Sequence, residues 1–352
     1  MSFQKIEKNM ELLEDNNTKI KKEPDKKEIK SPSNFEINDN SFFSVDLDNL
    51  SPEKEIKNKK EIKFFGVSEY YIKEISQELI LKYGQFFLQT FSQNNLQVPP
   101  LDFISKHKIN PLIRTKMVNW MLEVFYSFKS NEETIFSAVK LMDKYIWKSK
   151  DKIQNEDIHL IGMVCIYLAS KAYDITPIQL NSLITLVGHD IFDQETIKNM
   201  EKKIIKTINF DLLIPTTYEF IQFLFFDFYF NNKENIVGLK IKRLLEILKN
   251  CSIWISKMCN HFEYYSSVSP INLSFACIII AYDMMKKNCK SLNSSSEKFF
   301  KDWLQFLFKN IAKKSEIKDE IEKIYESIEK NYKEFEKMNL KNLYKYHTLY
   351  FE

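Results

Sequence analysis

Apolar residues recur three or four positions apart through most of this sequence, which is the spacing of helices with one buried face. The pattern begins near Val67 and continues in pieces of about 12 to 20 residues. Several pieces open with a typical helix-starting residue, such as Asn131, Asn155 or Asp193. None alternates as a half-buried strand would. The pattern therefore predicts an all-α protein, with five helices joined by short connections over residues 111–213.

Two of the predicted helices, over residues 158–169 and 271–285, are apolar on nearly all sides. Neighbouring helices must therefore enclose them. The stretch GMVCIYLASK from Gly162 matches SFACIIIAYD from Ser274 in its small residue, its Cys-Ile pair and its alanine. A match at this whole-domain spacing predicts a duplicated five-helix unit, with the second copy over residues 214–346.

The first part of the chain has a different character. Residues 1–62 are rich in Lys, Glu, Asp, Asn and Ser and have too few apolar residues to form a core, so we expect a disordered tail. Ser31 and Ser51 in this tail precede proline and are candidate phosphorylation sites, although Ser-Pro pairs are common in any disordered tail. Residues 63–110 are expected to form an N-terminal helix and a linker.

Composition narrows the class of protein further. The 51 basic and 48 acidic residues give a net charge of +3, which is too near neutral to favour nucleic-acid binding. No apolar run approaches the ~18 residues of a membrane span, and the N-terminus lacks the apolar core of a signal peptide. We therefore expect an intracellular protein that binds neither nucleic acid nor membrane.

No grouping of residues indicates catalysis or metal binding. There is no Ser-His-Asp grouping and no glycine-rich phosphate loop, the five histidines are scattered singly, and the cysteines form no Cys-x-x-Cys pair. We therefore expect no catalytic residue, no metal and no cofactor. The five cysteines are expected to be small buried thiols: Cys165, Cys251, Cys259, Cys277 and Cys289.

Three charged residues stand where helical spacing predicts apolar ones, and Arg114 is the first. It falls within the apolar arc that includes Val118 and Phe125. A buried guanidinium requires a carboxylate partner, and Asp143, among apolar residues of the next helix, is the best candidate. We expect an Arg114–Asp143 ion pair between the first two helices. The alternative is an exposed arginine at a fraying helix start.

The other two misplaced charges are Lys171, at the end of the first all-apolar helix, and Glu201, inside an apolar stripe with Ile205 and Ile208. A lysine near a helix C-terminus is also explained by the helix dipole. An acid in an apolar stripe is either paired internally or displayed on a docking surface. Together, the two residues predict a polar clamp for a helix of another protein.

The order and spacing of these segments resemble the cyclin box of A- and B-type cyclins. The resemblance is carried by IRTKMVNWMLEV from Ile113, ETIFSAVKLMDKYI from Glu133, LIGMVCIYLASK from Leu160, NMEKKIIKTINFDLLIPTTYEFI from Asn199 and SPINLSFACIIIA from Ser269. It extends from about Tyr70 to the final LKNLYKYHTLYF. It implies an N-terminal cyclin fold over residues 111–213 and a C-terminal cyclin fold over residues 214–346.

The resemblance also implies a role for each misplaced charge. Arg114 and Asp143 match the family's buried ion pair. Lys171 and Glu201 match the pair that grips the regulatory helix of a cyclin-dependent kinase. The apolar residues that match the same kinase-binding surface are Leu168, Ile205, Phe210 and Leu212.

A stripe at the rim of the first helix resembles the family's docking patch for Arg-x-Leu peptides on substrates and inhibitors. It consists of Ile113, Met117 and Trp120, with Glu123 as a nearby acid. Such a groove suits a cationic peptide that carries a leucine. Two departures weaken the match. Lys116 replaces an apolar residue and would repel the peptide's arginine, and His159 replaces a common amide.

Further departures concern the kinase interface and degradation. Ala172 replaces an aromatic residue, and Tyr173 and Asp174 replace two acids, so we expect an atypical kinase affinity or kinase choice. No arginine precedes Arg114. The tail therefore cannot contain the family's Arg-x-x-Leu destruction signal.

The predicted function is that of a non-catalytic regulatory subunit in the nucleus or cytoplasm. It would form a heterodimer with a cyclin-dependent Ser/Thr kinase, activate it and control cell-cycle progression. By binding the active kinase better than the inactive one, it would shift the kinase population towards activity. The alternatives are a transcriptional cyclin of an RNA polymerase kinase and, more weakly, a TFIIB-like factor. A TFIIB-like factor would carry an N-terminal zinc ribbon, which needs cysteines near the start of the chain. The first cysteine of this sequence is Cys165.

Overall fold

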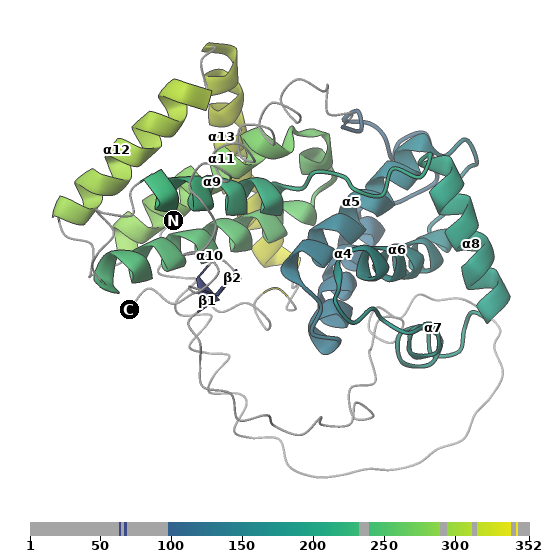
Figure 1. Ribbon diagram of the computed structural model, residues 1–352. Helices are drawn as coiled ribbons and strands as arrows, with labels where there is room; N and C mark the ends of the chain where they lie inside the picture. Colours follow the sequence, from purple (N-terminus) through teal and green to yellow (C-terminus); the bar gives the residue numbers. More distant parts are fainter. Residues whose placement is uncertain are drawn as a thin grey trace, which may run out of the picture. The chain divides into compact units, whose positions relative to one another are not determined.

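The computed structural model describes residues 63–64, 67–68, 98–231, 239–288, 294–311, 315–338 and 343 (Figure 1). All of them belong to one compact unit, Val45–Glu352. The predicted disordered tail, with Ser31 and Ser51, lies outside the described residues. So does most of the segment in which we expected an N-terminal helix.

The first described elements are two short strands. β1 (Lys63–Phe64) pairs antiparallel with β2 (Val67–Ser68), with Lys63 opposite Ser68 and Phe64 opposite Val67. The expectation that helical periodicity begins near Val67 is therefore wrong for the two residues of β2. Phe and Val favour an extended backbone when a partner strand is next to them, and here the partner is only two residues away.

The first repeat contains five α-helices, of which α7 is a short one that η1 extends. α4 (Pro111–Ser127), α5 (Glu132–Lys148) and α6 (Asp157–Tyr173) are followed by α7 (Leu180–Ser182), a π-helical turn η1 (Leu183–Val187) and α8 (Gln194–Thr207). Side-chain caps explain two starts. Asn110 accepts a 2.9 Å hydrogen bond from the Leu112 amide, and Asp193 accepts a 2.7 Å bond from the Thr196 amide. The predicted fourth helix is the segment formed by α7 and η1.

α6 is the central helix of this repeat and contacts α4, α5 and α8 (Figure 1). Most of its side chains between Ile158 and Ser170 are buried, as its apolar sequence predicted. Gly162 permits the close approach of α4, because a Cβ atom at this position would collide with the side chain of Met117. Enclosure by three helices explains why this segment has almost no polar face.

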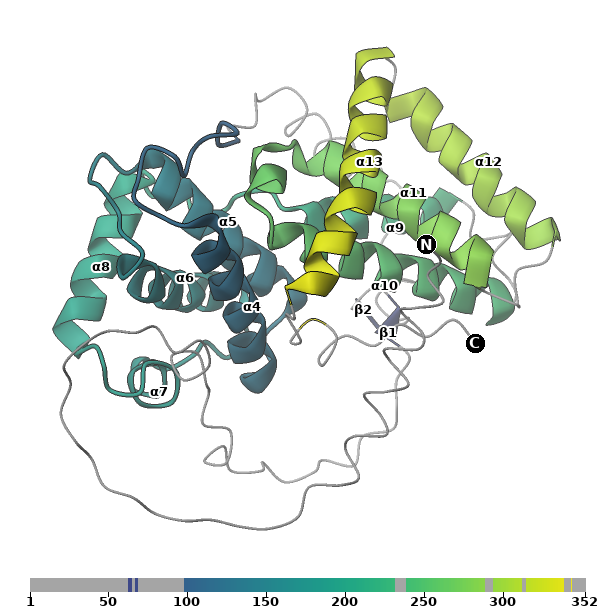
Figure 2. The same cartoon turned by 180° about the vertical axis from the view of Figure 1, so that it is seen from behind.

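Among the described residues, the second repeat also contains five α-helices. It contains α9 (Thr217–Asn231), α10 (Leu239–Asn260), a 3-10 turn η2 (Glu263–Ser267), α11 (Pro270–Asn288), α12 (Ser294–Ile311) and α13 (Ser315–Lys337). α11 takes the central place, in contact with α9, α10 and α13 (Figure 2). The two matching all-apolar segments are thus the central helices of two consecutive five-helix repeats. The predicted fold class is confirmed.

The second repeat starts with a reciprocal pair of hydrogen bonds. Oγ1 of Thr216 accepts a 3.2 Å bond from the Glu219 amide, and Oε2 of Glu219 accepts a 2.7 Å bond from the Thr216 amide. This capping box fixes the first turn of α9, which packs against α5 of the first repeat. Further contacts between the repeats are made by α10 with α5 and by η2 with α4. Among the described helices, none is long and apolar enough to span a membrane.

Candidate functional site

A fully buried ion pair joins the first two helices of the first repeat. Arg114 on α4 donates from Nε to Oδ1 of Asp143 at 2.8 Å and from Nη2 to Oδ2 at 2.6 Å, and neither residue is exposed. This two-pronged geometry is the strong form of an arginine–carboxylate contact. The structure therefore contains the ion pair that the sequence predicted between these two residues.

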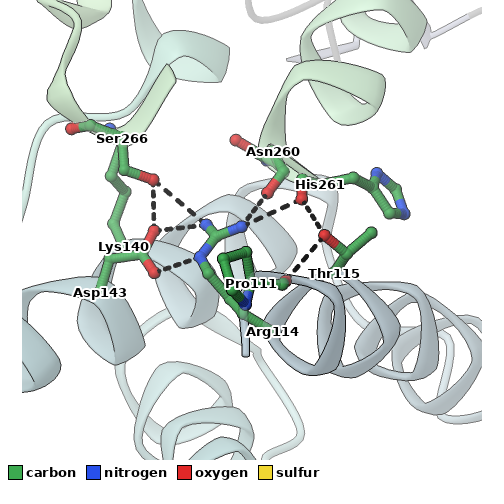
Figure 3. A network of polar contacts seen from close by, with 8 residues as sticks. All are labelled: Pro111, Arg114, Thr115, Lys140, Asp143, Asn260, His261 and Ser266. Atoms are coloured by element: carbon green, nitrogen blue, oxygen red, sulfur yellow. Dashed lines mark hydrogen bonds and ion pairs between the residues drawn. The ribbon is translucent and has the colours of Figure 1, made fainter. Parts of the chain in front are cut away.

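The same guanidinium also reaches the second repeat (Figure 3). Nη1 of Arg114 donates to the backbone carbonyls of Asn260 and His261, at 3.1 and 3.2 Å, and Nη2 donates to Oγ of Ser266 at 3.2 Å. Ser266 Oγ donates in turn to Asp143. All three second-repeat partners lie between the end of α10 and the end of η2. One arginine therefore links α4, α5 and the second repeat, which sequence reasoning did not anticipate.

A second cation, Lys140, lies beside this pair in Figure 3. Its ammonium donates to the Ser266 carbonyl at 3.5 Å. Burial lowers the pKa of Lys140 to about 8, while Asp143 opposes that shift and Arg114 adds to it. The carboxylate of Asp143 is thus the ion-pair partner of Arg114 and also favours the charged form of Lys140. Sequence reasoning missed Lys140, because one lysine in an amphipathic helix is usually solvated.

Lys171 and Glu201 form an ion pair at the surface. Lys171 lies in the last turn of α6 and Glu201 in the middle of α8. The side chain of Lys171 is 38% exposed and that of Glu201 is 17% exposed. The ammonium also lies over the Tyr167 ring, 4.2 Å from its centroid. The two charges are therefore together, and solvent reaches both of them.

The apolar residues assigned to the same surface differ in exposure. Leu168 is buried, Ile205 and Leu212 are half-buried, and Phe210 is 73% exposed. Phe210 and the preceding Asn209 have φ angles of 60° and 55°, a left-handed conformation that is uncommon for residues other than glycine. The turn after α8 thus holds a large aromatic side chain in solvent.

Two contacts fix this turn. The Phe210 amide donates to the Ile205 carbonyl at 2.9 Å, which closes the end of α8. Lys144 of α5 pairs with the carboxylate of Asp211, between Phe210 and Leu212. Sequence reasoning missed two further exposed apolar side chains, Ile175 and Leu213, because hydropathy alone does not reveal which apolar residues a fold leaves outside.

The stripe predicted to form a rim groove lies largely inside the repeat. Met117 and Trp120 are at most 1% exposed, whereas Ile113 and Glu123 are half-buried. The Trp120 ring packs edge-on against His159, with centroids 5.0 Å apart. Met117 and Trp120 thus face α6, whereas Ile113 and Glu123 lie nearer the surface. Their role in peptide docking stays a prediction.

His159, which replaces a common amide in the resemblance, is part of that packing. It lies between Trp120 and Phe192, whose ring centroid is 5.6 Å away. Burial lowers the pKa of His159 to about 4, with a smaller contribution from His189. The imidazole is therefore neutral at physiological pH, and its role in this structure is aromatic packing between α4 and α6.

The cysteines among the described residues are buried thiols. Cys165, Cys251, Cys259 and Cys277 are free and buried, as expected of small apolar side chains. Cys289 lies outside the described residues. In the described ranges, no three His, Cys, Asp or Glu side chains are grouped as metal ligands.

Comparisons with known proteins show which proteins this chain is similar to. Residues 86–213 match the family described as "Cyclin, N-terminal domain". Residues 86–213 are therefore similar to the N-terminal domain of cyclins, and this segment contains all of α4 to α8. The misplaced charges Arg114, Asp143, Lys171 and Glu201 all lie within this match.

Two of the similar proteins are named as mitotic cyclins. The chain is 23% identical to the G2/mitotic-specific cyclin-B3 of Caenorhabditis elegans over 248 residues, or 69% of this chain and 58% of that protein. It is 34% identical to the cyclin-B3 of Gallus gallus over 34% of this chain and 30% of that protein. A solved viral cyclin from herpesvirus saimiri aligns with a TM-score of 0.46 and 16% identity, over 64% of this chain and 96% of the viral one. The chain thus spans less than two thirds of these two curated relatives.

Proposed function

We propose that this chain is a regulatory subunit, without catalytic activity of its own, that binds and activates a cyclin-dependent Ser/Thr protein kinase. The names of its relatives, G2/mitotic-specific cyclins, support a role in cell-cycle progression. One observation carries the proposal most directly. Lys171 and Glu201 form an ion pair at the surface, bordered by apolar side chains, where the helix of a partner has access to both charges.

The proposed kinase-docking surface lies on the first repeat, which we assign to residues 111–213. It consists of Lys171, Glu201, Leu168, Ile205, Phe210 and Leu212. An ammonium group offers donors for the carbonyls of a partner's backbone, and a carboxylate offers acceptors for its amides. The exposed ring of Phe210 would add apolar area buried on binding. Residues 214–346, the assigned second repeat, hold the first repeat through Arg114.

Activation would follow from differential binding. A protein kinase needs a Lys–Glu ion pair that forms only when one of its helices is turned inward. If the docking surface contacts that helix in its inward position, the chain binds the active kinase more tightly than the inactive one. The active population then rises by the ratio of the two affinities. No group of this chain has to enter the active site.

Recruitment of substrates that carry Arg-x-Leu is a separate part of the proposal. The half-buried side chains of Ile113 and Glu123 are the parts of the predicted patch that solvent reaches. Glu123 would attract the arginine of such a peptide, and Lys116, also half-buried, would oppose it. We therefore propose weaker docking than in cyclins with an apolar residue at that position.

The test is activation of purified kinases. The chain is mixed with each member of a panel of catalytic subunits of cyclin-dependent kinases, and phosphorylation of a generic peptide and co-elution in gel filtration are measured together. We expect at least one kinase to co-elute with the chain and to gain activity. Co-elution without any gain in activity would contradict the regulatory role, and the absence of both would remove the proposal.

A further inference from the structure

The C-terminus of α6 and the N-terminus of α5 cap each other. Asn131 precedes α5, yet its side chain does not cap its own helix. Its Nδ2 donates instead to the Tyr173 carbonyl, at the end of α6, at 3.1 Å. In return, Oδ1 of Asp174, the residue after α6, accepts a 2.9 Å bond from the Asn131 amide. The end of α6 thus supplies an acceptor for a backbone amide at the start of α5, and the start of α5 supplies a donor for a backbone carbonyl at the end of α6.

Asp174 is the centre of this arrangement. Its Oδ1 also accepts a 2.7 Å bond from Oγ1 of Thr134, and its Oδ2 accepts a 2.7 Å bond from Oγ of Ser170. One half-buried carboxylate therefore receives three hydrogen bonds: one from Asn131, which precedes α5, one from Thr134 of α5 and one from Ser170 of α6. Its negative charge also lies at the N-terminus of α5, where the helix dipole stabilises an anion.

The hydrogen bond from Ser170 to Asp174 connects this arrangement to Lys171 of the proposed docking surface. Ser170 directly precedes Lys171 in the last turn of α6. Its hydroxyl donates to Asp174 and accepts a 2.9 Å bond from the Ile178 amide. The Asp174 amide, in addition, donates to the Ser170 carbonyl at 3.0 Å. The turn that carries Lys171 is therefore tied to α5 on one side and to the segment after α6 on the other.

We propose that Asp174 is a positioning residue of the kinase-docking surface, which joins the end of α6 to the first turn of α5 and so fixes the place of Lys171. This inference rests on the proposed function. Both carboxylate oxygens already have partners within the chain, so Asp174 acts through Lys171 and not as a kinase contact. The carboxylate of Asp174 thus binds groups of this chain and leaves kinase contacts to its neighbours.

The first experiment needs no partner. Hydrogen exchange of the free chain is compared between wild type, Asp174→Ala and the conservative Asp174→Asn, which keeps an acceptor for the Asn131 amide. In Asp174→Ala we expect the amides of Asn131, Asp174 and Ile178 to exchange about tenfold faster or more, with an intermediate effect in Asp174→Asn. Unchanged exchange at these amides in Asp174→Ala would overturn the proposal.

A matched control is available in the second repeat. Tyr325 on α13 donates a 3.0 Å bond to Asp283 on α11, which also links two helices through a carboxylate. Tyr325→Phe removes that bond without touching α5 or α6. It should leave exchange at the end of α6 as in wild type. Faster exchange there in this control would mean that exchange at the end of α6 reflects the overall stability of the protein and not the bonds to the Asp174 carboxylate.

The second experiment tests positioning by a double-mutant cycle. Binding is measured with the kinase that wild type activates most strongly in the panel, at a temperature where all variants are folded. Asp174→Ala should weaken binding about tenfold in wild type and hardly at all when Lys171→Ala is already present, since the two act as one unit. The same fold-change in both backgrounds would overturn the positioning role alone. A wild type that activates no kinase would remove the proposed function, and this role with it.

Discussion

Lys257 of α10 and Glu132 of α5 form an ion pair between the two repeats, although the side chain of Lys257 has no exposed surface. Lys257 also donates to the hydroxyl of Tyr126 on α4. Burial lowers the pKa of Lys257, and the neighbouring carboxylate of Glu132 opposes that shift. This contact is separate from the Arg114 network, so two buried cations, one in each repeat, hold the repeats together.

Removing the charge of Glu132 should destabilise the protein. In Glu132→Gln the buried ammonium of Lys257 loses its carboxylate, and we expect the free energy of unfolding to fall by about 3 kcal/mol, the lower end of the range for a broken buried pair. The side chain of Glu132 is one-third exposed, which favours the lower end. Urea unfolding followed by circular dichroism measures the change.

Lys257→Met is the control for that variant. It removes the buried cation itself and leaves the partly exposed Glu132 to be hydrated, so it should destabilise less than Glu132→Gln. If Lys257→Met is the more harmful of the two, the lysine contributes mainly through the packing of its aliphatic stem. The account of this contact as an ion pair would then be wrong.

Asp143→Ala should have a larger effect. It leaves the buried guanidinium of Arg114 without its ion-pair partner and removes the carboxylate that favours the charged form of Lys140. We expect a loss of about 3–5 kcal/mol in the free energy of unfolding. Because Arg114 also bonds to Asn260 and His261, proteolysis between the repeats should become faster. A variant as stable as wild type would contradict the assigned role of the pair.

Part of this architecture could be predicted because its physical cause is local. A helix without a polar face must be central, which identified α6 and α11. An arginine within an apolar arc must have a partner, and few acids share such a setting, so Asp143 was identifiable. In both cases, helical spacing alone carried the information.

The rest depended on tertiary distance. Nothing near Glu132 in sequence points to Lys257, which is far away along the chain and resembles any solvated lysine. The burial of Trp120 did not follow from the sequence, because a stripe at the border of an apolar arc faces either solvent or a neighbouring helix. Gly162 admits Met117 of α4 close to α6, and Trp120 packs against His159 of the same helix. The capping role of Asp174 likewise required knowing that α5 starts where α6 ends.

Lys171→Ala combined with Glu201→Ala should abolish kinase activation and leave stability nearly unchanged. An ion pair this close to solvent contributes at most about 1 kcal/mol to folding, whereas it supplies the polar contacts of the proposed docking surface. Kinase assays and urea unfolding are run on the same preparation. A large loss of stability would show that the pair is structural.

The matched control for that double variant is Lys203→Ala with Asp151→Ala. This pair also joins α8 to another part of the first repeat, at 2.8 Å, and both side chains are well exposed. It lies outside the proposed docking surface. Activation should be retained in this control. Loss of activation in this control would mean that any disturbance of the α8 surface abolishes activation. The assignment of Lys171 and Glu201 as specific kinase contacts would then be wrong.

A test of substrate docking needs a variant that does not remove a buried side chain of the predicted patch. Trp120→Ala should lower the free energy of unfolding by about 3–5 kcal/mol, because it opens a large cavity between α4 and α6. Any slower phosphorylation in that variant would therefore be ambiguous. Glu123→Gln changes a half-buried carboxylate without loss of volume and is the better test.

With Glu123→Gln we expect slower phosphorylation of substrates that carry Arg-x-Leu and an unchanged rate for a peptide that lacks it. The reason is the loss of attraction for the peptide's arginine. Lys116→Leu should have the opposite effect, because it removes the opposing cation. The two rates are measured side by side with the same kinase complex. Equal changes for both substrates, in either variant, would remove the docking part of the proposal.

The contact between the repeats should also depend on pH through Glu219. Burial raises the pKa of this carboxyl to about 7, and the nearby Glu133 adds to the shift by repulsion and a hydrogen bond. The folded protein therefore holds a proton that the unfolded chain has already lost between about pH 4.5 and pH 7. Stability must fall as pH rises through this window, since the folded state binds more protons there.

Glu219→Gln removes this titration and keeps an oxygen that can accept from the Thr216 amide, the bond that starts α9. Relative to wild type, the variant should become more stable between pH 5 and pH 8, by about 1–3 kcal/mol at the upper end. Glu133→Gln should produce a smaller change of the same sign, because burial of Glu219 remains. Urea unfolding at pH 5, 6, 7 and 8 gives both curves. If the difference in the free energy of unfolding between Glu219→Gln and wild type is the same at every pH, Glu219 does not titrate in this window. The proposed pH dependence would then be wrong.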